Sequence, residues 1–189
     1  MTKGELMESA GVRVRAFTAG DVALIREVSA DPAITSLTAV PPDADVPGAL
    51  GYLQQQRARA DDGLGYSFAI ASCDTDQACG QIGVWFERYE RASIGYWVAA
   101  RQRKRGIASV ALDLVSRWCL ARPGIHRLEL HIQPWNERSC RTAERVGYRR
   151  EGLLRGWQEV GGTRRDMVMY SLLATDLERD EVFEAGFER

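Results

Sequence analysis

Hydrophobic and polar residues alternate in seven short segments of this 189-residue chain. Alternation with a period of two predicts half-buried β-strands. The segments are residues 12–17, 66–70, 81–86, 94–98, 127–133, 148–154 and 167–172. The charged stretch 87–91 joins the third and fourth segments, and Gly161-Gly162 lies between the last two. Both connections are typical of antiparallel neighbours.

Two helices are predicted in the first third of the chain. Thr18, with Asp21 three residues later, marks the start of the first, and Asp31-Pro32 ends it. Its expected buried face is Leu24, Ile25 and Val28. Asp45 caps the second helix, with Pro47 in the first turn. Its apolar stripe is Val46, Ala49, Leu50 and Leu53, and a polar run at 54–59 follows. The weakly patterned segment 33–44 predicts a loop.

The clearest helix begins after residue 106. Its apolar residues recur at helical spacing and form one face: Ile107, Val110, Ala111, Leu114, Val115 and Trp118. A short helix capped by Asn136 and ended by Gly147 follows the strand 127–133. Because a strand–helix–strand unit normally forms a parallel crossover, the chain is expected to build a mixed α/β sheet. We predict one domain at 12–173, an N-terminal tail at 1–11 and an acidic tail at 174–189.

Composition excludes several classes of protein. Hydrophobic residues make up 45% of the chain, and a protein of this length buries enough surface to need no disulfide or metal. A net charge of −1 disfavours a general nucleic-acid binder. No apolar run approaches the ~18 residues of a membrane span, and the first residues lack the apolar core of a signal peptide. We therefore expect a cytoplasmic protein with no membrane or nucleic-acid partner.

The cysteines and histidines give no metal pattern. The four cysteines match no zinc or redox spacing and are expected to be free thiols: Cys73, Cys79, Cys119 and Cys140. His126 and His131 are five residues apart across a strand boundary, which is a poor spacing for a shared ion. We expect no metal.

Candidate chemistry is concentrated at residues 101–108, where a predicted strand ends and the clearest helix begins. Unpaired N–H groups and the helix dipole favour anions at such a point. Four cations stand there: Arg101, Arg103, Lys104 and Arg105. Gly106 permits close approach of the backbone to a ligand. The segment matches neither a Walker loop nor GxGxxG, so a phosphate cradle and a merely connecting basic loop remain equal alternatives at this point.

An ordered series of motifs resembles the GNAT (GCN5-related) N-acetyltransferases. Residues 103–108 match the [Q/R]-x-x-G-x-[G/A] pyrophosphate-binding loop of that family. Further matching segments lie before and after it, at 94–98, 124–130, 136–139, 146–148, 151–155, 165–166 and 170–172. Their order and spacing are similar to the branch that contains the ribosomal-protein acetyltransferases RimJ and RimL. The resemblance covers roughly residues 12–173.

This resemblance implies a twisted, mostly antiparallel sheet with a central parallel pair, and acetyl-CoA or another short acyl-CoA as co-substrate. The strand 94–98 would splay from 128–133, so that the backbone of Trp97, Val98 and Ala99 pairs with the pantetheine arm. The pyrophosphate would lie on Arg103, Lys104, Arg105, Gly106, Ile107, Ala108 and Ser109. Asn136 would lie beside the pantetheine, cap its helix, or do both. Homodimers occur in this branch.

The resemblance also implies direct attack by an amine on the thioester. The Val98 N–H suits the oxyanion, and an acid near the thiolate helps it to leave. Many family members place a Tyr acid seven residues beyond Asn136, but here that residue is Ala143. Ser139, one helical turn from Asn136, is the predicted replacement and a predicted contact of the cofactor.

The general base is less defined. Relatives commonly carry Glu where this chain has Ser93. The open candidates are Glu87, Glu90, Glu151 and Glu159. Glu151 is selected, although it could equally be a structural partner of an arginine. Proximity to an α-amine could also suffice without a dedicated base.

The predicted function is acyl transfer, most simply of acetyl, from CoA to a primary amine on a protein N-terminus or a small molecule. Three alternatives stand beside it. One is a transferase using succinyl-CoA or a longer acyl donor, and one is a catalytically silent acyl-CoA sensor. The third is a nucleic-acid module that uses the cations of 101–105, against which the net charge counts.

Overall fold

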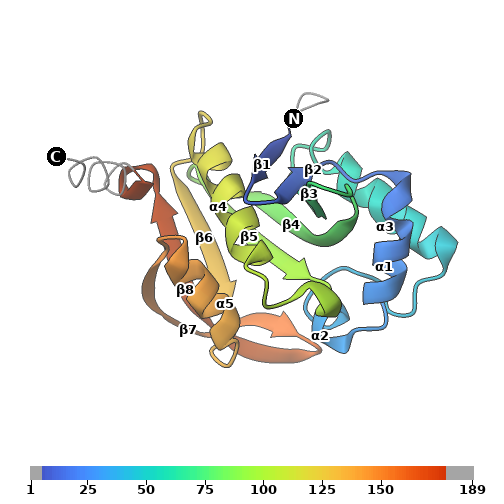
Figure 1. The fold of residues 1–189 in the computed structure, drawn as a ribbon. Coiled ribbons are helices and arrows are strands. Elements are labelled where there is room, and N and C mark those ends of the chain that lie inside the picture. Colours follow the sequence, from blue (N-terminus) through green and yellow to red (C-terminus); the bar gives the residue numbers. More distant parts are fainter. Residues whose placement is uncertain (1–5, 178–189) are drawn as a thin grey trace.

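One mixed sheet organises the computed structural model, which describes residues 6–177 (Figure 1). Its strand order is β1-β2-β3-β4-β5-β6-β8-β7. The strands are β1 Met7–Ser9, β2 Val12–Arg15, β3 Gly65–Ser72, β4 Ala78–Glu87, β5 Arg91–Val98, β6 Arg127–Ile132, β7 Arg149–Val160 and β8 Thr163–Leu173. Among these described strands, only β5 and β6 pair in parallel. The predicted fold class, a mostly antiparallel sheet with a central parallel pair, is confirmed.

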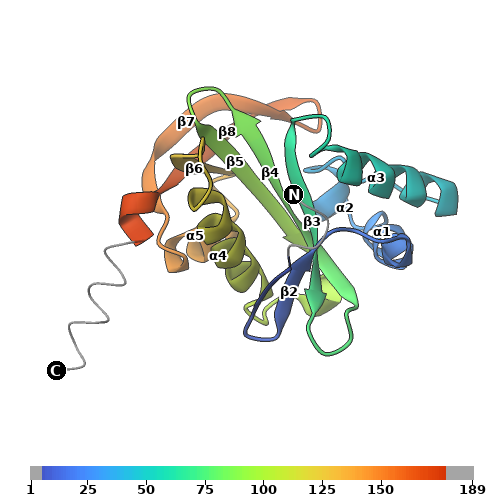
Figure 2. The ribbon, with the colours of Figure 1, turned by 90° about the horizontal axis from the view of Figure 1, so that it is seen from above.

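Helices cover both faces of this sheet. They are η1 Ala19–Asp21, α1 Val22–Val28, α2 Pro32–Thr35, α3 Val46–Ala58, η2 Ala100–Gln102, α4 Ile107–Leu120 and α5 Glu137–Arg145. Figure 2 shows α4 and α5 on one side of the sheet and α1 and α3 on the other. Alternate residues of a strand point to opposite faces. Accordingly Phe68 and Ile70 pack in the α4 core, whereas Ala69 packs in the α1–α3 core.

The buried face of α4 is rotated slightly from the predicted stripe. Ala111 and Val115 are fully buried as predicted, but Leu112 and Cys119 are buried as well. Trp118 lies at the edge of the contact, where its ring meets Tyr66 and Phe68 edge-on. The apolar pattern identified the helix, but the position of the sheet fixed which side faces inward.

Helix α3 differs more from its prediction. Val46 and Leu50, placed in the predicted stripe, are 45% and 37% exposed. The buried residues are Ala49, Tyr52, Leu53 and Gln56. Gln56 belongs to the polar run expected to follow the helix. It is buried because its amide joins a hydrogen-bond network on β4.

Three further segments depart from the predicted pattern. Residues 7–9 form strand β1, and residues 32–35 form the short helix α2 inside the predicted loop. The β7–β8 hairpin extends well beyond the predicted strands, up to the turn at Gly161-Gly162. Most side chains of β7 are exposed on both faces, so apolar alternation could not reveal its length. Residues 178–189 of the predicted acidic tail lie outside the described residues.

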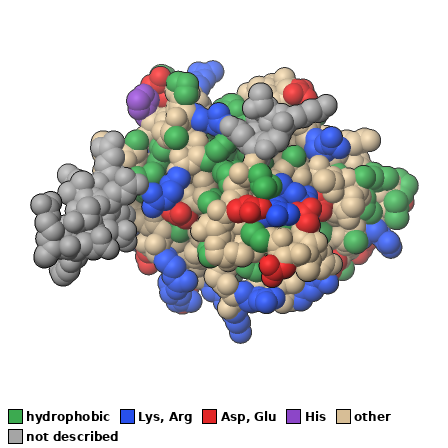
Figure 3. Space-filling model, turned by 45° about the horizontal axis from the view of Figure 1, so that its top comes forward, with side chains coloured by type: hydrophobic (Ala, Val, Ile, Leu, Met, Phe, Trp, Pro, Cys, Tyr) green, Lys and Arg blue, Asp and Glu red, His purple; other side chains and the backbone are tan. Residues whose placement is uncertain are grey.

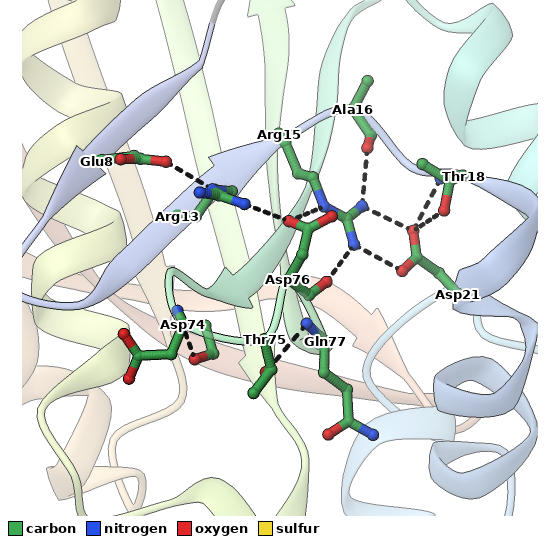
Figure 4. Close-up of polar contacts among 11 residues, drawn as sticks. Glu8, Arg13, Arg15, Ala16, Thr18, Asp21, Asp74, Thr75, Asp76 and Gln77 are labelled. Atoms are coloured by element: carbon green, nitrogen blue, oxygen red, sulfur yellow. Dashed lines mark hydrogen bonds and ion pairs between the residues drawn. The ribbon is translucent and has the colours of Figure 1, made fainter.

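Ion pairs attach β2 to the turn between β3 and β4 (Figure 4). Arg15 forms a two-fold contact with Asp21, with both N···O distances at 2.9 Å. Arg15 and Arg13 also reach the same carboxylate oxygen of Asp76, at 3.0 and 2.9 Å. Hydrogen bonds from these two guanidinium groups hold the pKa of Asp76 below its usual value. The network fixes where the chain leaves the sheet to form η1 and α1.

The parallel pair β5–β6 is the feature that creates the site. Its pairing consists of Arg91 with Arg127, Ala92 with Leu128, and Ser93 with Glu129. Beyond Ser93 the two strands separate, which agrees with the predicted splay. β4 continues to pair with β5 as far as Val98, and β8 with β6 as far as Ile132. The sheet is therefore split at its centre, with one free backbone edge on each side.

Candidate active site

The free edge of β5 presents peptide groups into the split. The Ala99 N–H donates to the Cys79 carbonyl on β4 at 2.9 Å. Since successive peptide groups of a strand point to opposite sides, the Val98 N–H points away from β4, toward the split. Of the backbone groups predicted to bind the pantetheine arm, the Val98 N–H is thus available, whereas the Ala99 N–H is already bonded to β4. Trp97 is bonded on the β4 side, paired with Gln81.

A cavity of about 870 Å³ opens on the α4–α5 side of the split. Its lining includes the predicted pyrophosphate segment 103–109, together with Trp97, Val98, Asn136 and Ser139. Gly106 is the N-cap of α4 with φ +77°, and Lys104 also has positive φ, at +65°. A Cβ added at Gly106 would meet nothing within 4 Å, so the helix start is open to the cavity. The fold thus brings all the predicted cofactor residues except Ala99 to one cavity.

Arg103 is held within the protein rather than pointing freely from it. Its Nε donates to the Val98 carbonyl at 2.9 Å, and its Nη2 lies 2.7 Å from Asp31 Oδ2. Asp31 caps α2 by accepting from the Ala33 N–H. Arg103 therefore fastens the loop to α2 and to the end of β5. Lys104 and Arg105 are exposed, and so is Arg101, which forms an ion pair with Glu27 at 2.8 Å.

Helix α5 contributes basic residues that the sequence analysis did not select. Arg138, Arg141 and Arg145 line the same cavity. They lie at i, i+3 and i+7, so they share one helix face. This helical spacing is the feature of the sequence from which the three arginines could have been predicted to lie together. Figure 3 shows Lys and Arg side chains gathered along the lower edge of the molecule. The rim of the cavity is accordingly positive.

A second cavity of about 480 Å³ opens on the other side of the split. It is bounded by α3, β4, β6 and the β7–β8 hairpin. The two cavities share six lining residues: Leu37, Thr38, Tyr96, Trp97, Asn136 and Ser139. A molecule entering from each side would therefore meet the other beside β5, close to Ser139.

Two hydroxyl groups lie at this junction. Tyr96 Oη and Ser139 Oγ are 2.9 Å apart. Burial raises the pKa of Tyr96, so its hydroxyl stays protonated at neutral pH. Asn136 Oδ1 accepts from the Ser139 N–H at 3.3 Å, which confirms the predicted helix cap and fixes Ser139 in the first turn of α5. Sequence analysis selected Ser139 but missed Tyr96, because nothing in the local sequence shows that β5 faces α5.

A buried polar network forms one wall of the smaller cavity. Gln81 Oε1 accepts from Tyr52 Oη at 2.5 Å and from Trp97 Nε1 at 3.1 Å. Gln81 Nε2 donates to Gln56 Oε1 and Ser67 Oγ, at 3.1 and 2.9 Å. Burial raises the pKa of Tyr52 to about 12, so it remains a neutral donor. The Gln81 amide is fully engaged, which fixes the Trp97 and Tyr52 side chains in place.

His131 also lines the smaller cavity, and its Nε2 is buried without a hydrogen-bond partner. The Trp157 ring from the hairpin stacks on it at 5.4 Å. Burial lowers the pKa of His131, and the charges of Glu129 and Glu87 partly oppose this shift. The imidazole is therefore neutral at pH 7. The sequence analysis considered His131 only as a metal ligand, rejected it in that role and gave it no other chemistry.

The carboxylates considered as bases do not line either cavity. Glu151 forms a two-fold ion pair with Arg127 and accepts from Ser171 Oγ at 2.6 Å. These bonds lower the pKa of Glu151 to about 2. This placement contradicts a base role and supports the structural alternative. Its cause is the β7–β8 pairing, which carries Glu151 to the closed end of the β5–β6 pair.

The other acidic candidates are also placed. Ser93 lines the smaller cavity, and its hydroxyl donates to Glu87 Oε1 at 3.2 Å. Glu90 lies 3.4 Å from His126 Nε2 in the β4–β5 turn, and Glu159 is exposed on β7.

Within residues 6–177, no group of three His, Cys, Asp or Glu could hold a metal ion. The four cysteines are free, and no helix in this part of the chain is long and apolar enough to cross a bilayer.

The split sheet, the open helix start and the paired hydroxyls define an acyltransferase of the GNAT class. A family model described as an acetyltransferase (GNAT) domain matches residues 12–149, and the chain belongs to that family. The predicted resemblance to this family and to its RimJ/RimL branch is confirmed. The chain is a GNAT-family N-acetyltransferase.

Three relatives illustrate this placement. The chain is 26% identical over 171 residues to the uncharacterized N-acetyltransferase p20 of Bacillus licheniformis, covering 89% of this chain and 96% of that one. It is 28% identical over 83 residues to the ribosomal protein uS5-alanine N-acetyltransferase of Escherichia coli, covering 44% and 43%. The solved structure of Mycobacterium smegmatis RimJ in complex with CoA-disulfide matches with a TM-score of 0.78 and 27% identity, over 97% and 93% of the two chains.

Proposed function

We propose that this protein transfers an acetyl group from acetyl-CoA to a primary amine by direct attack. The observation that carries the proposal is the meeting of two cavities at the split between β5 and β6, beside the Ser139 and Tyr96 hydroxyls. The larger cavity takes the donor and the smaller one the acceptor. Because the donor is a cytoplasmic metabolite, we place the reaction in the cytoplasm.

The larger cavity matches the chemistry of CoA. Phosphate oxygens favour a helix N-terminus whose N–H groups are free, here those of Gly106, Ile107 and Ala108. Lys104 and Arg105 add charge on the loop, and Arg138, Arg141 and Arg145 add it on α5. The free edge of β5 offers peptide groups to an extended amide chain such as pantetheine. RimJ of Mycobacterium smegmatis, similar in fold and 27% identical, was solved with CoA-disulfide.

At the junction the amine nitrogen forms a bond to the thioester carbonyl carbon. The carbonyl oxygen becomes an oxyanion, which the Val98 N–H stabilises. Collapse of this intermediate breaks the C–S bond and releases the CoA thiolate. Ser139 donates a proton to the sulfur, and Tyr96, hydrogen-bonded to Ser139, resupplies it. Asn136 keeps Ser139 at the helix start.

The proton lost by the amine needs an acceptor. No Asp or Glu lines the smaller cavity, and His131 is the one side chain of its lining whose ordinary pKa is near neutral; burial lowers that pKa and keeps the imidazole neutral. Its Nε2 has no partner in the protein. We assign to neutral His131 the role of receiving this proton, directly or through water. Solvent then carries one proton from His131 to Tyr96, which restores both groups.

The first test is calorimetric titration with acetyl-CoA, succinyl-CoA and free CoA, followed by release of the CoA thiol with a panel of amines. Tight acetyl-CoA binding and amine-dependent thiol release support the proposal. Preference for succinyl-CoA would change the acyl donor. Binding without turnover over the whole panel would indicate a sensor, and binding of none of the three would overturn the enzyme assignment for the site.

A further inference from the structure

The smaller cavity contains a cation that has no anionic partner. Arg59 follows the last turn of α3 and lines this cavity. Its guanidinium carbon lies 4.7 Å from the centre of the Trp85 ring. Arg59 Nη1 is buried and has no hydrogen-bond partner. Among residues 6–177 no carboxylate forms an ion pair with it.

Trp85 is held in place beneath this cation. Its indole lies over two glycines, one on β4 and one on β5. A Cβ added at Gly83 would be 2.7 Å from the ring, and one at Gly95 would be 3.2 Å from it. The first distance is shorter than real Cβ contacts, and the second is tighter than most of them. The two glycines therefore make room for Trp85, and Trp85 supports Arg59 from one side.

Arg59 is half-buried, with Nη1 fully buried. A guanidinium that is partly removed from water without a counter-ion is unfavourable, because it loses hydration and gains no ion pair. Burial lowers the pKa of Arg59, in agreement with this. The neighbouring polar groups give no compensation: Tyr52 is neutral, and the Gln81 amide is fully hydrogen-bonded within the protein. A charge kept in such a position suits an anion that arrives with a ligand.

We propose that the smaller cavity takes an acceptor that carries a carboxylate as well as its reactive amine, with Arg59 binding the carboxylate. This inference rests on the proposed function and names the substrate class of the same site. The acceptor is amino-acid-like: the carboxylate lies on Arg59 and Trp85, and the amine points toward Ser139 at the junction. A polycation such as a polyamine is disfavoured.

Charge and size favour a small monocarboxylate. One guanidinium neutralises one carboxylate, whereas a phosphate dianion would leave a charge uncompensated in the cavity. The volume of about 480 Å³ lies within the range of small-molecule sites. Trp85 and Trp97 offer apolar walls to the remainder of such a molecule.

The carboxylate could instead arrive on the acyl group of the donor, as in succinyl-CoA. The positions of the residues favour the acceptor. Neither Arg59 nor Trp85 lines the larger cavity, whereas both line the smaller one, on the α3–β4 side. The test separates the two sources.

The experiment compares pairs of α-amino acids and their carboxamides as acceptors, with acetyl-CoA as donor and CoA thiol release as the signal. Arg59→Gln is the test variant. Arg57→Gln is the matched control, because Arg57 is on the same helix and exposed. Arg59→Lys keeps the charge, and circular dichroism confirms that each variant is folded. As a second measurement, N-acetyl amino acids and their amides are titrated into the CoA-bound enzyme to compare their binding affinities.

We expect wild type and Arg57→Gln to prefer the carboxylate over the amide by about 10- to 100-fold in kcat/KM and in product binding. Arg59→Gln should lose this preference, mainly through a higher KM for the carboxylate, and Arg59→Lys should retain part of it. Equal use of amides and acids by wild type would overturn the inference. The inference would also be overturned if Arg59→Gln kept the wild-type preference for acids over amides, or if no N-acetyl amino acid bound to the CoA-bound enzyme.

An Arg59-dependent preference for succinyl-CoA over acetyl-CoA would also overturn it, since the carboxylate would then come with the donor. Failure of the proposed function looks different. In that case acetyl-CoA does not bind, or no amine of either kind releases thiol from a donor that is bound.

Discussion

The Tyr96 hydroxyl on β5 lies 2.9 Å from the Ser139 hydroxyl on α5. The same strand carries the Val98 N–H, two residues further along the free edge. The contact therefore joins the proposed proton donor to the strand that we propose stabilises the oxyanion. Tyr96 and Ser139 are both among the residues that line the two cavities together.

Loss of the Ser139 hydroxyl should slow turnover. We expect Ser139→Ala to lower kcat by about 10²-fold while the Kd of acetyl-CoA changes little, because the proton transfer occurs only as the thiolate leaves. Tyr96→Phe should have a smaller effect. The double variant should be no slower than Ser139→Ala, since the two hydroxyls act as one unit. Stopped-flow thiol release and calorimetry measure the two quantities; an unaltered kcat in Ser139→Ala would remove Ser139 from this role.

A bulky side chain at the start of α4 should block the donor. Gly106→Trp is expected to raise the Kd of acetyl-CoA at least ~10-fold, because the ring occupies the open helix start and φ +77° is strained for it. Gly124→Trp is the matched control: Gly124 has φ +85° with no atom near its Cβ position, and it lines neither cavity.

The charge of the same loop gives an independent test. Arg105→Glu should also weaken donor binding by ~10-fold or more, and the loss should shrink at high salt because the charge is exposed. Calorimetry at two salt concentrations measures this. Unchanged affinity in both Gly106→Trp and Arg105→Glu would contradict the assignment of the larger cavity to CoA.

The pH profile should reveal His131. Burial lowers its pKa below 6.5, Glu129 and Glu87 oppose that shift, and Arg91 and Arg127 add to it. A base must be neutral, so kcat/KM should fall as the pH drops through this lowered pKa. His131→Gln should lose that acidic limb and about 10²-fold in rate at pH 7. His126→Gln, at an exposed position, should keep both the acidic limb of the pH profile and the wild-type rate at pH 7. A profile of His131→Gln that retains the limb would assign it to another group.

Glu151 should affect stability rather than catalysis. Its pKa in the folded protein is lowered from 4.5 to about 2, first by the bonds from Arg127. It therefore contributes stability above pH 4.5, and this is lost as the pH falls from 4.5 toward 2. Because its side chain is 43% exposed, solvent screening limits the contribution to about 1 kcal/mol or less.

Glu151→Gln should accordingly lower Tm at pH 7 by no more than about 2–4 °C and leave kcat unchanged. The difference from wild type should narrow as the pH falls below 4.5. Glu159→Gln, at an exposed position on β7, is the control for both readings. A large loss of kcat in Glu151→Gln would restore Glu151 as a catalytic candidate.

The local pattern of the sequence was sufficient for most of the fold. Period-two alternation located the central strands, and helical spacing located α1 and α4, because burial of one face imposes those periods directly. Asn136 and Gly106 were identifiable as helix boundaries for the same local reason. Along β7 the side chains are exposed on both faces, so no alternation of apolar and polar residues predicts the length of the strand. In α3 a polar side chain, Gln56, is buried, so the apolar spacing does not predict which face of the helix packs inward.

The sequence by itself thus determined the fold class, the family and the loop expected to bind the donor, since each depends on residues that are neighbours along the chain. Only the tertiary structure decided the composition of the site. It placed Tyr96 beside Ser139, Arg59 over Trp85, and His131 in the lining of the smaller cavity, and it paired Glu151 with Arg127. These relationships cross from strand to helix over long separations in sequence, and they are set by the register of the sheet and the point at which β5 and β6 part.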